Sequence, residues 1–147
     1  MHPGPRHVTQ RGFSLIELMV TVVIVGILTA VAIPSYRSYV MRSNRTAAKT
    51  AILDLASRQQ QHLMTSRGYA DKATLTAEGY APDREATRYY SWDVTVDNSA
   101  TPPSFTITFQ GTGTQASDGG LRMDSAGTKS TLDKNGSVTT SVDNWNQ

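Results

Sequence analysis

The clearest pattern along the chain is a continuous apolar segment near its N-terminus, from Phe13 to Ile33. The only charged residue of this segment is Glu17, and Pro34 comes directly after its last residue. At about 1.5 Å of rise per residue, a helix of this length matches a hydrocarbon core roughly 30 Å thick. The pattern therefore predicts a helix that can span a membrane, with one carboxylate among its first residues that is costly to place in lipid.

A second, amphipathic pattern continues from Asn44 to Arg67. Its apolar residues recur at helical spacing along one face and are Ala48, Ile52, Leu55, Ala56 and Leu63. We assign the segment from Gln59 to His62 to the polar surface and expect Gly68 to be a left-handed C-cap. The pattern predicts that the helix continues past Pro34 and packs this stripe on a sheet.

The residues after Gly68 change to turn formers and then to alternating patterns. The segment from Tyr69 to Arg88 has no sustained period, which predicts a connecting loop with room for one short turn. The predicted strands then lie at 89–96, 104–110, more weakly at 121–124, and around an Asn135-Gly136 hairpin turn between Leu132 and Val138. We therefore expect an α+β fold, a long N-terminal helix packed on a roughly four-stranded antiparallel sheet.

The start of the apolar segment, Arg11-Gly12-Phe13-Ser14-Leu15-Ile16-Glu17, resembles the hallmark of type IV prepilins. That hallmark is a short basic leader ending in Gly, then Phe, then an apolar helix with Glu at its fifth position. The resemblance implies that a prepilin peptidase cuts between Gly12 and Phe13 and methylates the new Phe13 amino group. It also implies that Glu17 neutralises the N-terminal amine of a neighbouring subunit, as an assembly salt bridge in the fibre.

Two other interpretations of the segment are less consistent with it. A secretory signal peptide would use Ala30-Val31-Ala32 as its cleavage site, but the apolar run is too long and carries an acid. A plain transmembrane anchor leaves Glu17 unexplained. Pro34 removes a helical hydrogen bond to Ala30 and predicts a kink there. The resemblance implies that the stretch from Gly26 to Pro34 supplies helix flexibility and can lose helicity in the fibre.

The C-terminal half resembles the heads of PilE-like minor pilins in the order of its strands, its Gly119-Gly120-Leu121 segment and its near-terminal Trp145. Many pilins close this region with a disulfide, but the chain has no cysteine, and Gly119 and Asn144 stand roughly where the two would be. Hydrogen bonding, Trp145 packing or an ion must substitute. Carboxylates that offer oxygen ligands for calcium are Asp118, Asp124, Asp133 and Asp143. We favour a turn at Asp133 and expect no metal site and no cofactor.

The charged residues bear on two predictions, the affinity of the chain for DNA and its orientation in the membrane. The chain carries 14 basic and 12 acidic residues, and the leader holds two of the basic ones, Arg6 and Arg11, so removing it balances the mature chain. A chain with balanced charge has little overall electrostatic attraction for DNA. A small basic and aromatic cluster could bind DNA, but we interpret it mainly as the start of a strand with solvent-exposed arginines; its members are Arg84, Arg88, Tyr89 and Tyr90. The flank after the span is more basic than the leader, so charge alone does not predict a cytoplasmic N-terminus, and we take that orientation from the resemblance.

These observations lead to one functional expectation. His62 is the only histidine after the leader and no nucleophile motif is present, so we do not expect an enzyme. We expect a minor pilin, a structural subunit of a type IV pilus that supports pilus biogenesis, twitching motility or adhesion. The alternatives are a type II secretion pseudopilin, which shares the N-terminus, and a DNA-binding pilin for DNA uptake.

The same resemblance sets the expected organisation and partners. Residues 1–12 form the leader, 13–34 the membrane and assembly half of the helix, 35–67 its amphipathic half, and 68–147 the head. Expected partners are prepilin peptidase, other pilin subunits through the N-terminal helix, an inner-membrane assembly platform and the lipid bilayer before assembly, whereas we do not expect DNA. The expected location is the inner membrane, single-pass with the head in the periplasm, and then the extracellular pilus fibre.

Overall fold

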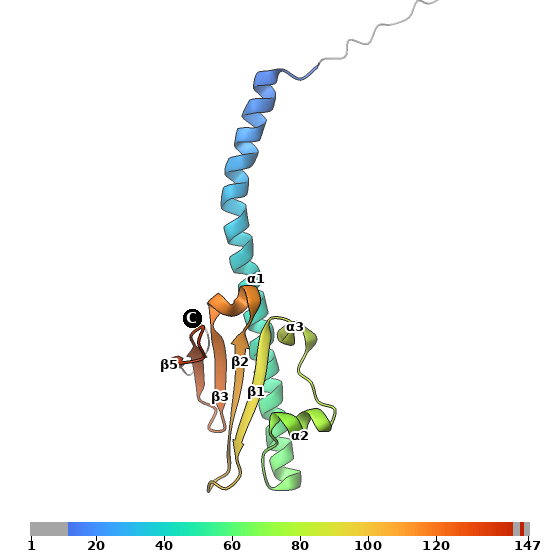
Figure 1. Ribbon diagram of the computed structural model, residues 1–147, viewed down its shortest axis with the longest axis vertical. Coiled ribbons are helices and arrows are strands. Elements are labelled where there is room, and N and C mark those ends of the chain that lie inside the picture. The colour runs from blue at the N-terminus through green and yellow to red at the C-terminus, as the bar shows by residue number, and fades with distance from the viewer. Residues whose placement is uncertain (1–11, 143–144, 146–147) are drawn as a thin grey trace, which may run out of the picture. The chain divides into compact units, whose positions relative to one another are not determined.

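The computed structural model describes residues 12–142 and Trp145 (Figure 1). The chain divides into two compact units, residues 1–38 and residues 39–147, which are described separately below. Helix α1 (Leu15–Ser66) contributes its first part to the first unit and its remainder to the second.

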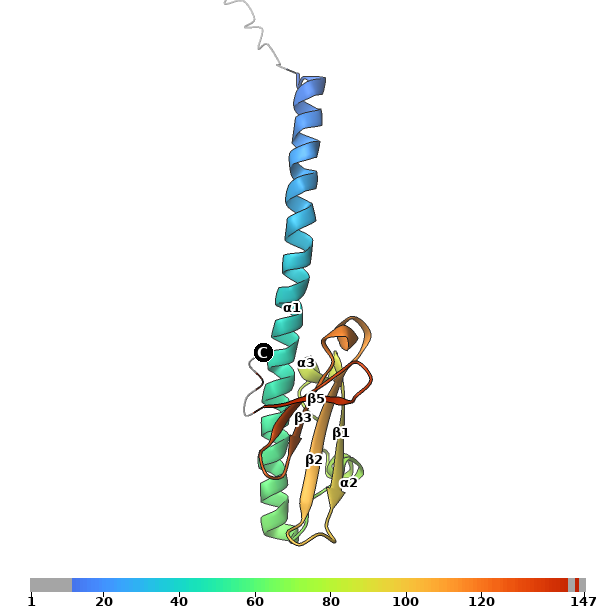
Figure 2. The same cartoon turned by 90° about the vertical axis from the view of Figure 1, so that its left-hand side faces the viewer.

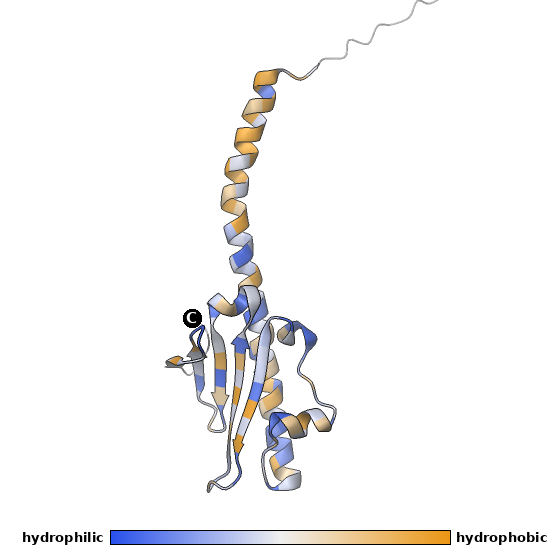
Figure 3. Ribbon diagram, in the orientation of Figure 1, coloured by the Kyte–Doolittle hydropathy of each residue, from blue (hydrophilic) through white to orange (hydrophobic). Residues whose placement is uncertain are grey.

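The first unit contains the apolar part of α1, whose residues are mostly hydrophobic (Figure 3) and whose large hydrophobic side chains are exposed. This is a stretch long and apolar enough to cross a membrane. The hydroxyls of Thr21, Thr29 and Ser35 donate to carbonyl oxygens four residues earlier, so these polar groups are satisfied within the helix. The helix runs through Gly26 and Pro34 without a break.

The second unit, the head, contains a five-stranded antiparallel sheet in the order β1-β2-β3-β4-β5 (Figure 2). Its strands are β1 (Tyr90–Asp97), β2 (Ser104–Gly111), β3 (Gly120–Asp124), β4 (Lys129–Leu132) and β5 (Val138–Val142). The sequence predicted roughly four strands, and the Asn135-Gly136 turn does connect β4 to a further strand. The fifth strand was missed because Val138–Val142 carries hydroxyl residues rather than a clear apolar alternation.

The core of the head lies between α1 and one face of the sheet. From the helix, Ala48, Ile52 and Leu55 are fully buried, as the apolar stripe predicted. From β2, the alternating residues Phe105, Ile107 and Phe109 are buried, and Val94 of β1 lies opposite Ile107. The spacing of apolar residues along the helix and along the strands therefore identified the face of α1 and the face of the sheet that pack against each other.

The connection between α1 and β1 contains more structure than the sequence predicted. It forms two short helices, α2 (Lys72–Ala77) and α3 (Arg84–Thr87). Asp71 and Asp83 cap them, since each carboxylate accepts a hydrogen bond from a backbone N–H in the first turn. Helices of six and four residues are too short to show a period, so only the two capping residues could have indicated them.

The end of α1 differs from the prediction at Gly68. The residue with positive φ is Arg67, at 57°, and Gly68 is instead closely packed. A Cβ atom at Gly68 would lie 3.2 Å from the Asn98 side chain. Gly68 is therefore required by this close approach and is not the left-handed C-cap.

Gln59 was assigned to the polar surface, and this was wrong, because its side chain is fully buried. Its Nε2 donates to the Ala70 carbonyl at 2.6 Å and its Oε1 accepts from the Ala70 N–H at 2.9 Å. Asn98 clamps both backbone groups of Tyr69 in the same manner. Two side-chain amides thus fix the start of the connection to β1.

Replacing Gln59 by leucine is expected to destabilise the head by about 2 to 3 kcal/mol, because two buried backbone groups of Ala70 lose their partners. Urea unfolding of the full chain in micelles measures the change. Gln60→Leu is the matched control, since Gln60 is exposed on the same helix and should change stability little. Equal stability of Gln59→Leu and the wild type would contradict the clamp.

Trp145 packing and a backbone hydrogen bond are found in the region where many pilins have a disulfide. The ring is buried, its Nε1 donates to the Ser130 carbonyl at 3.2 Å, and the Lys129 ammonium lies 5.5 Å from the ring centre. Gly119 has φ 74°, and a Cβ atom there would overlap the Leu132 carbonyl oxygen. No side chain, cysteine included, fits at Gly119 without moving β4. Asn144 lies outside the described residues.

Candidate functional site

The N-terminal motif is placed where a protease can reach it. Gly12, Phe13 and Ser14 precede the helix and are not helical. Phe13 is 78% exposed, and nothing lies within 4 Å of a Cβ placed on Gly12. The peptide bond between Gly12 and Phe13 is therefore in an accessible, non-helical segment, which proteolysis requires.

Glu17 lies in the first turn of α1 and is exposed. A carboxylate in this position interacts favourably with the positive end of the helix dipole, and it would equally attract a neighbouring amine. Gly26 and Pro34 lie inside the helix. The loss of helicity there in a fibre stays a prediction.

The head carries a basic surface at α3, which we call the arginine surface and define as Arg42, Arg84, Arg88 and Tyr89. Arg84 and Arg88 are four residues apart, and the Arg88 guanidinium lies 5.4 Å from the centre of the Tyr89 ring. Within the described part of the head, no ion pair holds any of the three guanidiniums. Cations that are not paired internally remain available for phosphate groups.

Arg42 reaches this surface from α1. It lines a hollow of about 450 Å³ together with hydroxyl residues of the helix and Glu85 of α3. Glu85 also lines a second hollow with Arg84 and Arg88, so the two are adjacent. Sequence reasoning did not connect Arg42 with α3, because the two are far apart along the chain and only the fold places residues of α1 and α3 around one hollow.

Tyr90, the fourth member of the cluster that the sequence suggested, is not part of the arginine surface. It is buried, and its hydroxyl donates to Asp118 at 3.0 Å. Asp118 also pairs with Arg45 at 2.9 Å, and Gln115 donates to both Asp118 and the Tyr90 oxygen. Burial and the Asp118 carboxylate raise the pKa of Tyr90 well above its usual range. This network joins α1, β1 and the 3-10 helix η1 (Gly113–Asp118), and its role is structural.

The 3-10 helix η1 follows β2 almost directly. It is a short turn that orients Gln115 and Asp118 toward α1. Lys49 lies near the same network, and its partial burial, followed by the Arg45 charge, lowers its pKa.

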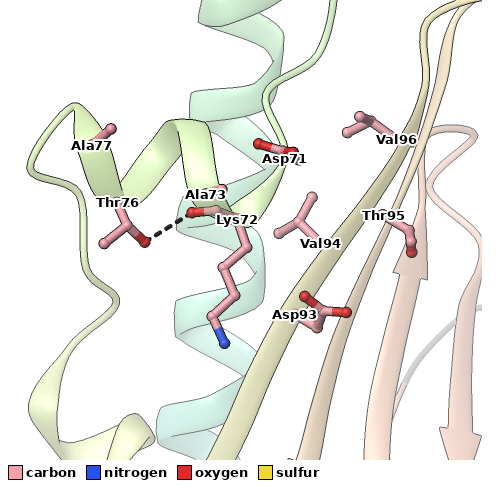
Figure 4. Close-up of a pocket in the computed structure, with 9 residues that line it drawn as sticks. All are labelled: Asp71, Lys72, Ala73, Thr76, Ala77, Asp93, Val94, Thr95 and Val96. Atoms are coloured by element: carbon pink, nitrogen blue, oxygen red, sulfur yellow. Dashed lines mark hydrogen bonds between the residues drawn. The ribbon is translucent and has the colours of Figure 1, made fainter.

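The largest hollow among those described lies between α2 and β1 and has a volume of about 920 Å³ (Figure 4). Asp71 and Asp93 line it, and Figure 4 shows the Lys72 side chain extending away from Asp71. The Lys72 ammonium donates to the Trp92 carbonyl at 2.8 Å and lies 4.9 Å from the Trp92 ring centre. Because two carboxylates line this groove and its lysine is already engaged, the groove does not suit an anionic polymer.

Among the described residues, no group of three carboxylate or histidine side chains is arranged to hold a metal ion. Asp124 and Asp133 each accept hydrogen bonds from backbone N–H groups of their own turns. Asp118 belongs to the network with Arg45 and Tyr90, and Asp143 lies outside the described residues. The oxygen ligands suggested for calcium therefore have other structural roles where they are described.

Comparison with known proteins gives two family matches. Residues 34–121 match the family described as "Type IV minor pilin ComP, DNA uptake sequence receptor", and residues 8–33 match the "Prokaryotic N-terminal methylation motif". The first match contains every residue of the arginine surface. Its description conflicts with our expectation that DNA is not a partner.

Individual relatives are pilins and fimbrial proteins. The chain is 38% identical over 106 residues to the fimbrial protein EcpC of Eikenella corrodens, covering 71% of the chain and 65% of EcpC. It is 42% identical over 74 residues to the type IV major pilin protein PilA of Myxococcus xanthus, covering 50% of the chain and 33% of PilA. The chain thus spans between about a third and two thirds of these relatives. No solved structure matches it.

Proposed function

We propose that this chain, which belongs to the type IV minor pilin family and is a structural, non-enzymatic subunit, binds DNA for uptake through its arginine surface. The observation that carries the proposal is the family match over residues 34–121, which spans α3 and the adjoining part of α1. The minor pilin that we expected stands, and the match favours the alternative kept beside it, a DNA-binding pilin for DNA uptake, over a main role in pilus biogenesis, twitching motility or adhesion.

The chemistry of the arginine surface supports this proposal. DNA affinity comes mainly from neutralising backbone phosphates, and a guanidinium is suited to bind phosphate oxygens through two parallel hydrogen bonds. Arg84 and Arg88 lie on one side of a short, capped helix, and Tyr89 stacks under Arg88 and restricts it. Asp83 is already used to cap α3, so its carboxylate is directed to a backbone N–H of Glu85.

Assembly into the fibre is the second part of the proposal. Prepilin peptidase cuts between Gly12 and Phe13 and methylates Phe13, and Glu17 then pairs with the amine of a neighbouring subunit. The methylation motif at residues 8–33 and the exposed, non-helical Gly12–Ser14 segment support this order of events. The apolar part of α1 holds the subunit in the inner membrane until an assembly platform moves it into the fibre.

The double variant Arg84→Ala/Arg88→Ala is expected to weaken DNA binding at least about tenfold and to reduce the salt dependence of binding. Each phosphate contact contributes about 0.9 to the slope of log affinity against log salt, so two contacts predict a change of about 1.8. Fluorescence anisotropy of labelled duplex DNA with the full chain in micelles, at several salt concentrations, measures both.

The control is Lys134→Ala, which removes an exposed cation at the turn after β4, away from the β1 side of the sheet. It should bind DNA as the wild type does. Wild-type protein without salt-sensitive DNA binding would overturn the proposed function. Binding that survives the double variant unchanged would overturn the assignment of the arginine surface.

A further inference from the structure

One ridge of α1 holds the connection between α1 and β1 at three successive turns. Asp54 accepts a hydrogen bond from the Tyr80 hydroxyl at 2.9 Å, and the Arg58 guanidinium lies 4.9 Å from the centre of the Tyr80 ring. One turn further on, His62 contacts Glu78, the residue that caps the C-terminus of α2. These contacts fix residues 78–80 against the helix.

The His62 contact differs from the other two because its geometry fixes which nitrogen carries a proton. Nδ1 is 2.9 Å from the Gly68 carbonyl oxygen, which can only accept, so Nδ1 must be the donor. Nε2 is 3.3 Å from a carboxylate oxygen of Glu78. In the neutral ring, Nε2 therefore presents a lone pair to a carboxylate, and two acceptors face each other.

Protonation reverses the sign of this contact. The imidazolium donates from both nitrogens, to Gly68 and to Glu78, and the second bond is charge-assisted. Histidine is the side chain whose charge ordinarily changes near physiological pH, so a contact of this kind can respond to pH. The Tyr80 contacts do not change there, because burial and the Asp54 hydrogen bond raise the pKa of the Tyr80 phenol far above neutral.

Other charged groups near this ridge have different partners. Arg58 lies over Tyr80, Asp54 accepts from the Tyr80 hydroxyl, and Asp71 accepts from the Thr74 N–H at the start of α2. At the end of β1, Asp97 accepts from the N–H groups of Ser99 and Ala100. In the described part of the chain, Glu78 is the one charged group within ion-pair distance of His62.

We propose that His62 is a pH-sensitive latch for α2: the protonated ring holds Glu78 and closes the C-terminal end of α2 onto α1, and the neutral ring releases it. The latch acts on the connection between α1 and β1, and the Tyr80 contacts keep residue 80 attached to α1 whether or not His62 is protonated. It does not depend on DNA binding, since none of its residues belongs to the arginine surface.

Hydrogen exchange of the full chain in micelles, followed by mass spectrometry at pH 6 and pH 8 and corrected for intrinsic rates, tests the latch. The peptide covering α2 and Glu78 is expected to exchange about threefold more slowly at pH 6 than at pH 8, a size that suits a partly exposed ion pair. Glu78→Gln should remove this difference, because a neutral amide pairs with either form of the ring.

Tyr80→Phe is the matched control for a contact that does not titrate. It should speed exchange of the same peptide at both pH values and keep the ratio between them. A wild-type peptide that exchanges equally at both pH values, or a ratio of exchange rates left unchanged by Glu78→Gln, overturns the latch.

Discussion

Glu17→Ala is expected to leave cleavage at Gly12 intact and to lower incorporation of the subunit into fibres by more than about tenfold, the scale set by one uncompensated charge in an apolar environment. Each mature subunit brings an N-terminal amine at Phe13 to the start of an apolar helix. An amine there opposes the positive end of the helix dipole, so without a carboxylate it is buried unpaired in the packed fibre. The peptidase acts before this pairing exists, so processing should not depend on Glu17.

Mass spectrometry of membranes and of sheared fibres separates the two steps. Membranes should contain Glu17→Ala protein that begins at methylated Phe13, and fibres should lack it. Thr21→Ala is the control one turn further along the helix, because its hydroxyl is satisfied by the Glu17 carbonyl and has no part in pairing the amine. Normal amounts of Glu17→Ala in fibres would contradict this role, and unprocessed protein in membranes would show that Glu17 serves the peptidase instead.

The sequence was sufficient for features that depend on neighbouring residues. A helical period identified Ala48, Ile52 and Leu55 as core residues, and strand alternation did the same for Phe105, Ile107 and Phe109. The Asn135-Gly136 turn was also correctly located between two strands. In each case the physical rule acts over a few residues, because one buried face fixes the spacing of apolar side chains.

The sequence was insufficient where a residue's role depends on distant partners. Gln59 has the composition of a surface residue but is buried, because Ala70 offers it both a donor and an acceptor. Arg42 joins the arginine surface only after α3 packs on α1. Balanced total charge argued against DNA, yet cations can be concentrated on one surface while carboxylates serve as helix caps at Asp71 and Asp83.

At Gly119, where many pilins have a cysteine, both the local backbone conformation and a contact with a distant strand exclude a side chain. In the sequence, Gly119 stands roughly where many pilins have one of the two cysteines. In the structure, its backbone has φ 74° and ψ −138°, a region open essentially to glycine alone, and it lies directly against the Leu132 carbonyl of β4. The backbone approaches so closely here that it leaves no room for a side chain, and Trp145 then packs nearby against Ser130.

Gly119→Ala is therefore expected to destabilise the head by about 3 kcal/mol or more, the largest stability effect predicted for a single substitution in this chain. Two costs add. The added methyl group must displace β4, which is paired on both sides with β3 and β5, and alanine must adopt a backbone conformation that its Cβ disfavours. Because β4 also carries the Ser130 carbonyl that accepts from Trp145, the displacement should also loosen the C-terminal segment.

Urea unfolding of the full chain in micelles measures this loss, with the fluorescence of its two tryptophans, Trp92 and Trp145, following the unfolding of the head. Gly127→Ala separates the two costs, since Gly127 also has positive φ, at 84°, but has nothing within 4 Å of an added Cβ. It should lose only about 1 kcal/mol, the cost of the backbone conformation alone. If the two variants are equally stable, the contact with Leu132 carries no energy and β4 is free to move; a much larger loss at Gly119 establishes that close packing, in place of a disulfide, holds this part of the head.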